Sequence, residues 1–366
     1  MNLEFTVTPS SNPASPQKKQ EILADPGFGQ YFSDHMVSID WTADPAPAGS
    51  WQRGQVQAYG PLSLDPATAV FHYGQEIFEG IKAYRHADGS IWTFRPEANA
   101  ARMQKSAQRL ALPQLPTELF IESLKQLMAL DASWVPSGQG QAFYLRPFMI
   151  ATEAYLGVRP TRQAKYMLIG SPVANYFGSL KPVDIWLSST YSRAGQGGTG
   201  TAKCGGNYAA AMLAQVEAEE HGCQQVIFKD PYRQDAIEEL GGMNIFFVYG
   251  AENRLVTPAL NGTILEGITR DSLIQLAKDR SMTVEEAPIT LANWREDLAK
   301  GAITEIFACG TAAVVSPIGT LKTAEGNIGP AGGQQPGPVT LALREELLGI
   351  QSGQLADRHG WLTRLA

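Results

Sequence analysis

The stretch "GGTGTAKCGGNYAAAML" (197–213) places a single lysine, Lys203, among glycines and small residues, directly before a predicted helix. The first turn of a helix exposes unpaired N–H groups and carries a partial positive charge, which disfavours an ammonium there and should lower the pKa of Lys203. A lysine that loses its proton easily is a nucleophile. The alternative is an ordinary solvated lysine in a loop, and the other segments of the chain must distinguish the two.

The composition is that of a folded globular protein with room for two domains. The 366 residues are 44% hydrophobic and 9% aromatic, and the net charge of −7 without a long basic run argues against a nucleic-acid partner. The amino-terminal segment lacks the apolar core of a signal peptide, and no window approaches a membrane span. Three cysteines without paired spacing suit a reducing compartment, and five scattered histidines indicate no metal site. These features predict a cytoplasmic protein.

The order of apolar patterns predicts two domains of mixed helices and strands. Residues 1–175 are expected to form a small α+β domain, with residues 1–24 flexible, a strand at 141–150 and a helix at 96–112. Residues 176–182 are the predicted linker, and 183–366 the larger, α/β-rich domain. Its strands are expected near 183–192, 224–229, 244–249 and 303–308, and its helices at 207–221, 269–280 and 336–349. Asn261-Gly262 is predicted to turn between two strands.

The residues around Lys203 favour imine chemistry over nucleotide binding. The phosphate-loop pattern GxxxxGK[ST] fails, because only two residues separate Gly200 from Lys203 and Cys204 follows the lysine. A neutral lysine amine can instead condense with an aldehyde, and pyridoxal 5′-phosphate is the aldehyde that most often needs it. That coenzyme requires an anion cradle, a carboxylate for the pyridine nitrogen and a donor for the phenolate oxygen.

Two glycine turns are candidate anion cradles. In "LNGTILEGITRDSLIQLAKD" (260–279), a strand and a tight turn at Gly267 are predicted to lead into a helix through Ile268 and Thr269, whose N–H groups and hydroxyl could bind phosphate. The alternative is that Thr269 is an ordinary N-cap. The second turn, "ACGTAAVV" (308–315), offers the small-residue amides of Thr311 and Ala312.

The carboxylate and the phenolate donor each have candidates. Glu238 and Glu239 precede two glycines and a hydrophobic strand, and either is a surface charge or a buried partner that keeps the pyridine nitrogen protonated. Tyr208 lies at the predicted helix start after Lys203, where it either packs in the core or donates to the phenolate.

Six motifs together show a family resemblance. They are "FHYGQEIFEGIKAYR" (71–85), "YLRP" (144–147), "GTAKCGGNYA" (200–209), "EELGGMN" (238–244), "LNGTILEGITR" (260–270) and "EIFACGTAAVVSPIG" (305–319). In this order they closely resemble the branched-chain amino acid aminotransferases, of the fold type IV class of pyridoxal phosphate enzymes, from about residue 25 to the carboxyl end. The resemblance implies a small α+β amino-terminal domain and a larger pseudo-barrel α/β carboxyl-terminal domain.

The resemblance also implies roles for the coenzyme-binding residues. Lys203 is implied to bind the coenzyme aldehyde and to carry a proton between the substrate α-carbon and the coenzyme C4′. Glu239 is implied to face the pyridine nitrogen and Tyr208 the phenolate oxygen. The implied phosphate ligands are Arg102, Ile268, Thr269 and Thr311, in which the guanidinium supplies a fork of donors that lysine cannot.

The same resemblance implies the substrate pocket and the reaction. Phe28, Phe78, Tyr144 and Tyr176 are implied to surround an apolar side chain, with Tyr73, Leu156 and Val158 contributed by the partner subunit of a homodimer. Arg146, on the same side of a strand as Tyr144, is implied to accept the distal carboxylate of glutamate, and the Thr311 and Ala312 amides the substrate α-carboxylate. The implied reaction transfers the amino group of leucine, isoleucine or valine reversibly to 2-oxoglutarate.

Some positions depart from the family, and other functions remain as alternatives. Ala313 and Ser316 stand where some relatives carry a Cys-x-x-Cys pair, and Gly242 where relatives often have threonine. A D-amino acid aminotransferase or an aminodeoxychorismate lyase is the alternative within the fold. An aldolase-like Schiff-base enzyme without coenzyme, or a non-catalytic binder of a phosphate ligand, is the alternative from another class.

Overall fold

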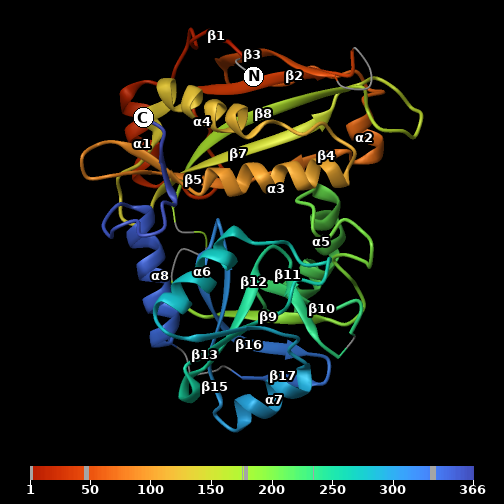
Figure 1. The fold of residues 1–366 in the computed structure, drawn as a ribbon, viewed down its shortest axis with the longest axis vertical. Helices are drawn as coiled ribbons and strands as arrows, with labels where there is room; N and C mark the ends of the chain where they lie inside the picture. The colour runs from red at the N-terminus through yellow and green to blue at the C-terminus, as the bar shows by residue number, and fades with distance from the viewer. Residues whose placement is uncertain (1–2, 45–48, 175, 177–179, 234, 330–334) are drawn as a thin grey trace. The chain divides into compact units, whose positions relative to one another are not determined.

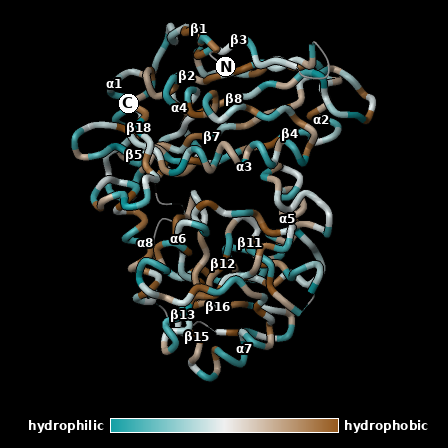
Figure 2. The backbone as a smooth tube through the Cα atoms, viewed as in Figure 1, coloured by the Kyte–Doolittle hydropathy of each residue, from teal (hydrophilic) through white to brown (hydrophobic). Residues whose placement is uncertain are grey.

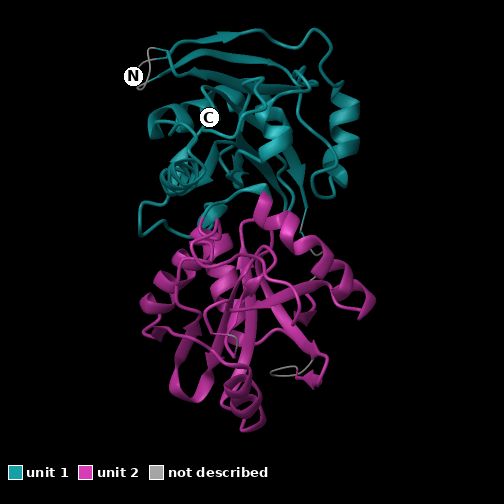
Figure 3. Cartoon of the chain, turned by 90° about the vertical axis from the view of Figure 1, so that its right-hand side faces the viewer, with its two compact units in different colours: residues 1–176, 202–205, 350–366 teal, residues 177–201, 206–349 magenta. Residues whose placement is uncertain are grey.

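The computed structural model describes residues 3–44, 49–174, 176, 180–233, 235–329 and 335–366, and the chain divides into two compact units (Figure 3). Unit 1 contains residues 1–176, 202–205 and 350–366, and unit 2 contains residues 177–201 and 206–349. Within the predicted linker, residues 177–179 lie outside the described residues. The division at residues 176–182 stays a prediction. The units assign the lysine segment 202–205 and the carboxyl-terminal residues 350–366 to unit 1.

Unit 1 is built on a nine-stranded sheet (Figure 1). Its strands run in the order β1 (Phe5–Val7), β3 (Ser50–Ala58), β2 (His35–Thr42), β8 (Gln163–Val173), β7 (Ala142–Ala151), β5 (Ile81–Arg85), β6 (Ile91–Phe94) and β18 (Leu362–Arg364), with β4 (Glu76–Phe78) paired to β7. All pairs are antiparallel except β1 with β3. The chain's last strand therefore completes the sheet that the first strands begin.

The helices of unit 1 give the sheet one buried face. They are α1 (Pro16–Ala24), α2 (Ala69–Tyr73), α3 (Pro96–Arg109), α4 (Thr117–Asp131) and the 3-10 turn η1 (Ala132–Trp134). In α3, Pro96 occupies the first turn and Ala100, Met103 and Ala107 are buried at helical spacing. Figure 2 shows hydrophilic and hydrophobic segments alternating around this helix. The predicted helix at 96–112 is confirmed.

Strand β7 separates the core of unit 1 from a second, less buried face. Phe143, Leu145 and Met149 are fully buried in the core that contains α3 and α4, whereas Tyr144 and Arg146, at the alternate positions, are only partly buried. The predicted strand at 141–150 is confirmed. Its alternation places the candidate substrate-binding side chains together on the face opposite the core.

Unit 2 contains a second nine-stranded sheet of mixed direction. Its order is β11 (Ile237–Leu240), β10 (Gln225–Lys229), β9 (Val183–Ser188), β16 (Val314–Thr323), β15 (Ile303–Gly310), β12 (Asn244–Tyr249), β13 (Arg254–Thr257) and β14 (Thr283–Glu286), with β17 (Gly326–Ile328) paired to β16. The helices are α5 (Gly205–Glu220), which begins in the lysine segment, α6 (Ile268–Asp279), α7 (Leu291–Ala299) and α8 (Pro338–Gln351), besides the turn η2 (Gly250–Glu252). The four strands and three helices predicted in this region are confirmed. Every residue of β12 is buried, and Asn244 is its polar exception before the five residues IFFVY.

The prediction that Asn261-Gly262 turns between two strands is wrong. The element after β13 is α6, and residues 258–267 contain no strand, so the strand expected before Gly267 is absent as well. The Asn261 side chain accepts hydrogen bonds from the N–H and hydroxyl of Thr263, and it donates to Asp230 at 2.8 Å. These hydrogen bonds of the Asn261 side chain stabilise the loop conformation, so no pairing between strands is needed there.

Candidate active site

Lys203 is anchored through its main chain within unit 1. Its N–H donates to the Ser106 hydroxyl at 2.9 Å, and its carbonyl accepts from the Phe78 N–H at 2.9 Å. Ser106 is fully buried on α3, and the Lys203 ammonium lies 4.8 Å from the centre of the Phe78 ring. Half-burial and two fixed main-chain groups favour a site residue over an ordinary solvated loop lysine.

Arg102 lies one helical turn before Ser106 on α3, in a buried ion pair that the sequence did not indicate. Its Nε and Nη2 each donate to a different oxygen of Glu79 at 2.8 Å. Glu79 is fully buried, and it also accepts from the Asn99 amide at 2.8 Å and from the Gly80 N–H at 3.3 Å. A guanidinium has five N–H donors, so this side-on pair uses two and fixes the plane of the others.

Five candidate pocket residues lie together in unit 1. Phe28 packs edge-on against Tyr144 and Tyr176, with ring centres 5.4 and 4.9 Å apart. Arg146 donates to the Tyr144 hydroxyl at 3.1 Å, and its guanidinium lies 4.8 Å from the centre of the Phe78 ring. The structure thus brings aromatic walls and one cation into a single cluster.

Arg146 has a carboxylate nearby, that of Glu76, but forms no ion pair with it. Within the described ranges, no carboxylate forms an ion pair with Arg146, and its Nε is buried without a hydrogen-bond partner. Glu76 accepts from the Gly205 N–H. Burial raises the pKa of Glu76, while the Gly205 N–H and the charge of Arg146 oppose that rise. Arg146 is therefore a cation with capacity for an anionic ligand.

The residues implied to reach a partner subunit are exposed in this single chain. The Tyr73 hydroxyl donates to the Leu156 carbonyl, so these two residues lie together. Leu156 is 62% exposed, Val158 is 87% exposed and Tyr73 is 40% exposed, so the three form an exposed apolar group.

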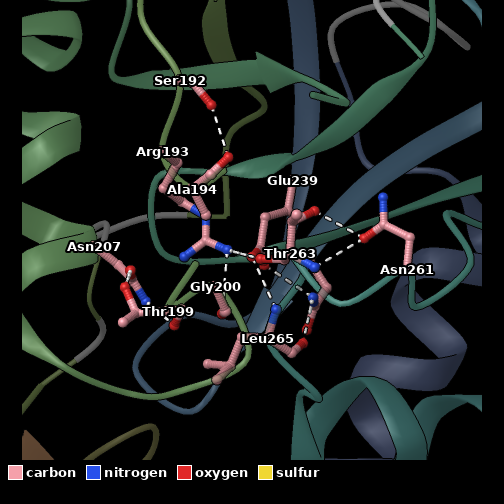
Figure 4. Close-up of polar contacts among 11 residues, drawn as sticks. Ser192, Arg193, Ala194, Thr199, Gly200, Asn207, Glu239, Asn261, Thr263 and Leu265 are labelled. Carbon is pink, nitrogen blue, oxygen red and sulfur yellow. Dashed lines mark hydrogen bonds and ion pairs between the residues drawn. The ribbon is translucent and has the colours of Figure 1, made fainter. Parts of the chain in front are cut away.

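In unit 2, Glu239 lies on β11 at the centre of a buried polar cluster (Figure 4). Its Oε1 forms an ion pair with Arg193 Nη2 at 2.6 Å and accepts from the Leu265 N–H at 3.0 Å, while its Oε2 accepts from the Asn244 amide at 3.1 Å. Arg193 and Glu239 are 5% and 3% exposed. The carboxylate is held from three directions.

The adjacent Glu238 has a different environment. It is fully buried, and neither of its carboxylate oxygens has a hydrogen-bond partner in normal geometry among the described residues. Burial raises the pKa of Glu238 to about 7, against the lowering effects of Arg193 and Thr263. The interpretation of Glu238 and Glu239 as surface charges is wrong for both. Of the two, Glu239 has the geometry of a fixed anionic partner.

The start of α6 is packed against the same cluster. Its N-cap is Gly267, and no side chain caps the helix, so Thr269 lies within the first turn and the interpretation of Thr269 as the N-cap is wrong. Asn244 donates to the Leu265 carbonyl at 3.2 Å, and a Cβ at Gly267 would collide with the Asn244 Oδ1. Glycine is required there because Asn244 approaches the backbone closely. The first turn, with Ile268 and Thr269, is therefore an open set of N–H donors.

The second glycine turn and Tyr208 also belong to unit 2. Thr311 and Ala312 follow β15 directly, where Cys309 pairs with Asn244 across the sheet. A Cβ at Gly242 would lie 3.6 Å from the Tyr208 ring, so this glycine adjoins the tyrosine as well as following Glu239. The coenzyme-binding candidates thus divide between the units. Lys203 and Arg102 belong to unit 1, and Tyr208, Glu239, Ile268, Thr269 and Thr311 belong to unit 2.

Sequence reasoning missed the residues that hold the candidates in place. These are Glu79, Asn99, Ser106, Arg193 and Asn244. Glu79 and Asn244 stand inside quoted motifs, so their polarity beside apolar residues was a usable signal. The pairings with Arg102 and Glu239 join distant segments, and no local pattern reports them.

The described part of the chain has neither a cluster of metal-ligating side chains nor a membrane-spanning helix. It contains no group of three or more His, Cys, Asp or Glu that could hold a metal ion. None of its helices combines the length and apolar character needed to cross a membrane.

Comparison with known proteins gives this site its family. The model of the amino-transferase class IV family matches residues 76–321, and the chain belongs to that family. Within it, the chain is 57% identical to a branched-chain-amino-acid aminotransferase of Mycolicibacterium smegmatis over 99% of this chain and 98% of that protein. The relatives of this chain are thus branched-chain aminotransferases, and the resemblance of its six motifs to that family is confirmed.

Solved structures agree. A crystal structure of an Escherichia coli branched-chain amino acid aminotransferase has a TM-score of 0.73 and 27% identity, covering 85% of this chain and 97% of that one. The branched-chain amino acid aminotransferase of T.th., complexed with N-(5′-phosphopyridoxyl)-L-glutamate, has a TM-score of 0.69 and 28% identity, covering 90% of this chain and 99% of that one. The fold type IV, two-domain α/β architecture expected from the sequence is confirmed.

Proposed function

We propose that this chain is a pyridoxal 5′-phosphate-dependent branched-chain-amino-acid aminotransferase that transfers the amino group of L-leucine, L-isoleucine or L-valine reversibly to 2-oxoglutarate. The observation that carries the proposal is the arrangement around Phe78. Its ring centre lies 4.8 Å from both the Lys203 ammonium and the Arg146 guanidinium. The candidate nucleophile Lys203 and the candidate carboxylate receptor Arg146 therefore both contact the same aromatic side chain, Phe78.

The donor set fits the coenzyme. When bound, pyridoxal 5′-phosphate supplies an aldehyde and an electron-withdrawing ring. Arg102, with its plane fixed by Glu79, and the uncapped N–H groups of Ile268 and Thr269 suit the phosphate, together with Thr311. The buried, ion-paired Glu239 suits the ring nitrogen, and Tyr208 the phenolate oxygen.

Lys203 performs two tasks in this account. Its amine would hold the coenzyme at its aldehyde carbon, and the same amine, once substrate has released it, would carry a proton between the substrate α-carbon and the coenzyme C4′. The Ser106 hydroxyl and the Phe78 N–H hold only the main chain of Lys203. The backbone that aims the amine is therefore fixed by contacts separate from those of the side chain.

The pocket must accept an apolar and an acidic side chain in turn. Phe28, Phe78, Tyr144 and Tyr176 surround the branched side chain, and each buried methylene contributes about 0.8 kcal/mol. Arg146, bonded to the Tyr144 hydroxyl, accepts the distal carboxylate of glutamate, and the Thr311 and Ala312 amides bind the α-carboxylate. One pocket then serves both half-reactions.

The functional protein is a cytoplasmic homodimer in this proposal. The exposure of Tyr73, Leu156 and Val158 supports it, because neighbouring exposed apolar side chains are a feature of protein interfaces. Tyr73, bonded to Leu156, would enter the pocket of the partner subunit with them.

Steady-state turnover tests the function. With L-leucine and 2-oxoglutarate, we expect wild-type turnover that Lys203→Ala abolishes while the protein stays folded, and that Lys300→Ala, at an exposed surface lysine, retains. Full activity of Lys203→Ala would contradict the proposal. Turnover of D-amino acids without turnover of L-leucine would favour the alternative D-amino acid aminotransferase.

A further inference from the structure

Arg193 has a buried side chain to which neither the motifs nor the proposed reaction assigns a task. We propose that Arg193 is a positioning residue that holds Glu239 ionised and aimed at the coenzyme ring nitrogen, and that it selects Glu239 over the adjacent Glu238 for this purpose. The inference rests on the role proposed for Glu239. It concerns how the chain prepares that carboxylate before any ligand binds.

The guanidinium of Arg193 is fixed by main-chain carbonyls as well as by Glu239 (Figure 4). Its Nη2 contacts the Thr263 carbonyl and the Gly200 carbonyl, the latter at 3.4 Å. A Cβ at Gly200 would collide with the Thr263 backbone, so these two loops pack directly on each other. Arg193 therefore joins both loops to Glu239.

The two loops are themselves held by asparagine side chains. Asn207 donates to the Thr199 carbonyl at 2.8 Å, next to Gly200, and Asn261 accepts from the Thr263 N–H at 3.0 Å. The carbonyls that orient Arg193 thus belong to braced segments. A braced cation gives its carboxylate partner a defined position at little cost in entropy during binding.

The contacts of Glu239 are unequal between its two oxygens. Oε1 receives the cation of Arg193 at 2.6 Å and the Leu265 N–H at 3.0 Å, whereas Oε2 receives the neutral Asn244 amide at 3.1 Å. The charged donor therefore neutralises mainly Oε1.

Arg193 also distinguishes the two neighbouring buried carboxylates, Glu238 and Glu239. It forms an ion pair with Glu239, while Glu238 is fully buried with its pKa raised to about 7. Burial penalises the charged form of a carboxyl, and an adjacent cation offsets that penalty. Without Arg193, Glu239 would keep the neutral donors Leu265 N–H and Asn244 but lose the cation that offsets the burial penalty. A neutral carboxyl there could not keep the ring nitrogen protonated.

A comparison of the affinities for two coenzymes tests whether Arg193 positions Glu239 or only supports the fold. Full-length apoproteins of wild type, Arg193→Met, Arg193→Lys, Glu239→Gln and Glu238→Gln are titrated with pyridoxal 5′-phosphate and with its 1-deaza analogue, in which C–H replaces the ring nitrogen. Bound coenzyme is followed by absorbance. The analogue keeps the phosphate, aldehyde and phenolate, so it removes only the group that Glu239 serves.

We expect Arg193→Met to weaken pyridoxal 5′-phosphate binding about tenfold or more and analogue binding less than about twofold. Arg193→Lys should show a smaller selective loss, and it carries the test if Arg193→Met does not fold. Glu238→Gln, the matched control, should retain the wild-type ratio of the two affinities. Equal losses for both coenzymes in the Arg193 variants, with a selective loss in Glu239→Gln, would overturn the inference alone.

Failure of the underlying assignment has its own signature. If Glu239→Gln weakens both coenzymes equally, Glu239 does not serve the ring nitrogen, and the role of Arg193 falls with it. Turnover and its loss in Lys203→Ala test the proposed function independently of these affinities.

Discussion

Among the described residues, a buried arginine–glutamate pair with a neighbouring asparagine occurs in each unit, and the arginine and glutamate exchange roles between the two pairs. In unit 1, Glu79 takes Arg102 side-on through two bonds of 2.8 Å, with Asn99 on the same carboxylate. In unit 2, Arg193 meets Glu239 end-on at 2.6 Å, with Asn244 on the other oxygen. Both pairs lie almost entirely out of water.

The difference shows which member of each pair serves a ligand. A phosphate needs a cation, so in unit 1 the glutamate is the support and Arg102 the proposed ligand-binding member. A protonated ring nitrogen needs an anion, so in unit 2 Arg193 is the support and Glu239 the proposed ligand-binding member. The side-on geometry consumes both oxygens of the supporting glutamate, whereas the end-on geometry concentrates the arginine on one oxygen of Glu239.

Breaking the pair of unit 1 should give the largest effect on stability. Glu79→Ala leaves Arg102 and Asn99 buried without the carboxylate that both contact, at a cost of about 3–5 kcal/mol in the free energy of unfolding. Denaturant unfolding of the apoprotein measures it. A loss below about 1 kcal/mol would mean that the pair is not a support and would break the comparison.

Glu238, which lacks such a pair, should show the reverse behaviour. Its pKa is raised to about 7 in the folded state from an ordinary 4.5, so the folded state binds the extra proton and stability falls as pH rises between these values. Arg193, Glu239 and Asp230 are the charged groups that act on it. Glu238→Gln removes the penalty, and we expect a gain of roughly 3 kcal/mol at pH 8 and none at pH 4.

Calorimetry of wild type and Glu238→Gln at the two pH values checks this sign. An equal effect at pH 4 and pH 8 would show that ionisation of Glu238 is not the cause. Glu296→Gln, at an exposed carboxylate, serves as the control.

Arg146 sharpens the comparison as an arginine with no carboxylate bonded to it among the described residues. Arg146→Met should raise the Michaelis constant for glutamate about thirtyfold. This corresponds to roughly 2 kcal/mol of binding free energy, because a charged hydrogen bond to the distal carboxylate is lost. The constant for leucine should change by less than about threefold. Equal changes for both substrates would refute the role of Arg146.

Much of the fold was predictable, and candidate site residues could be named, because both depend on local patterns. Lys203 just before a helix, the helix that starts at Ile268 and the alternation around Tyr144 each appear within a short window, and each was confirmed as a structural feature, although Gly267 is an extended N-cap and not the tight turn expected. The supports were not predictable. Arg193 and Glu239 belong to segments far apart in sequence, and an arginine in a loop is indistinguishable from a surface residue until the fold pairs it.

The errors have a common cause. The Asn261-Gly262 pattern predicts a strand turn, although the Asn261 side chain bonds Thr263 and Asp230 locally. Residue preference allows Thr269 as an N-cap, although Gly267 takes that position because Asn244 leaves no room for a Cβ. In both cases a side-chain contact decided the conformation, and residue preferences alone do not encode it.

The most direct test of the account is the chemical location of the coenzyme. Borohydride reduction of the holoprotein, followed by peptide mapping by mass spectrometry, should place a single pyridoxyl adduct on Lys203. An adduct on another lysine, such as the buried Lys82 of unit 1, would contradict the account.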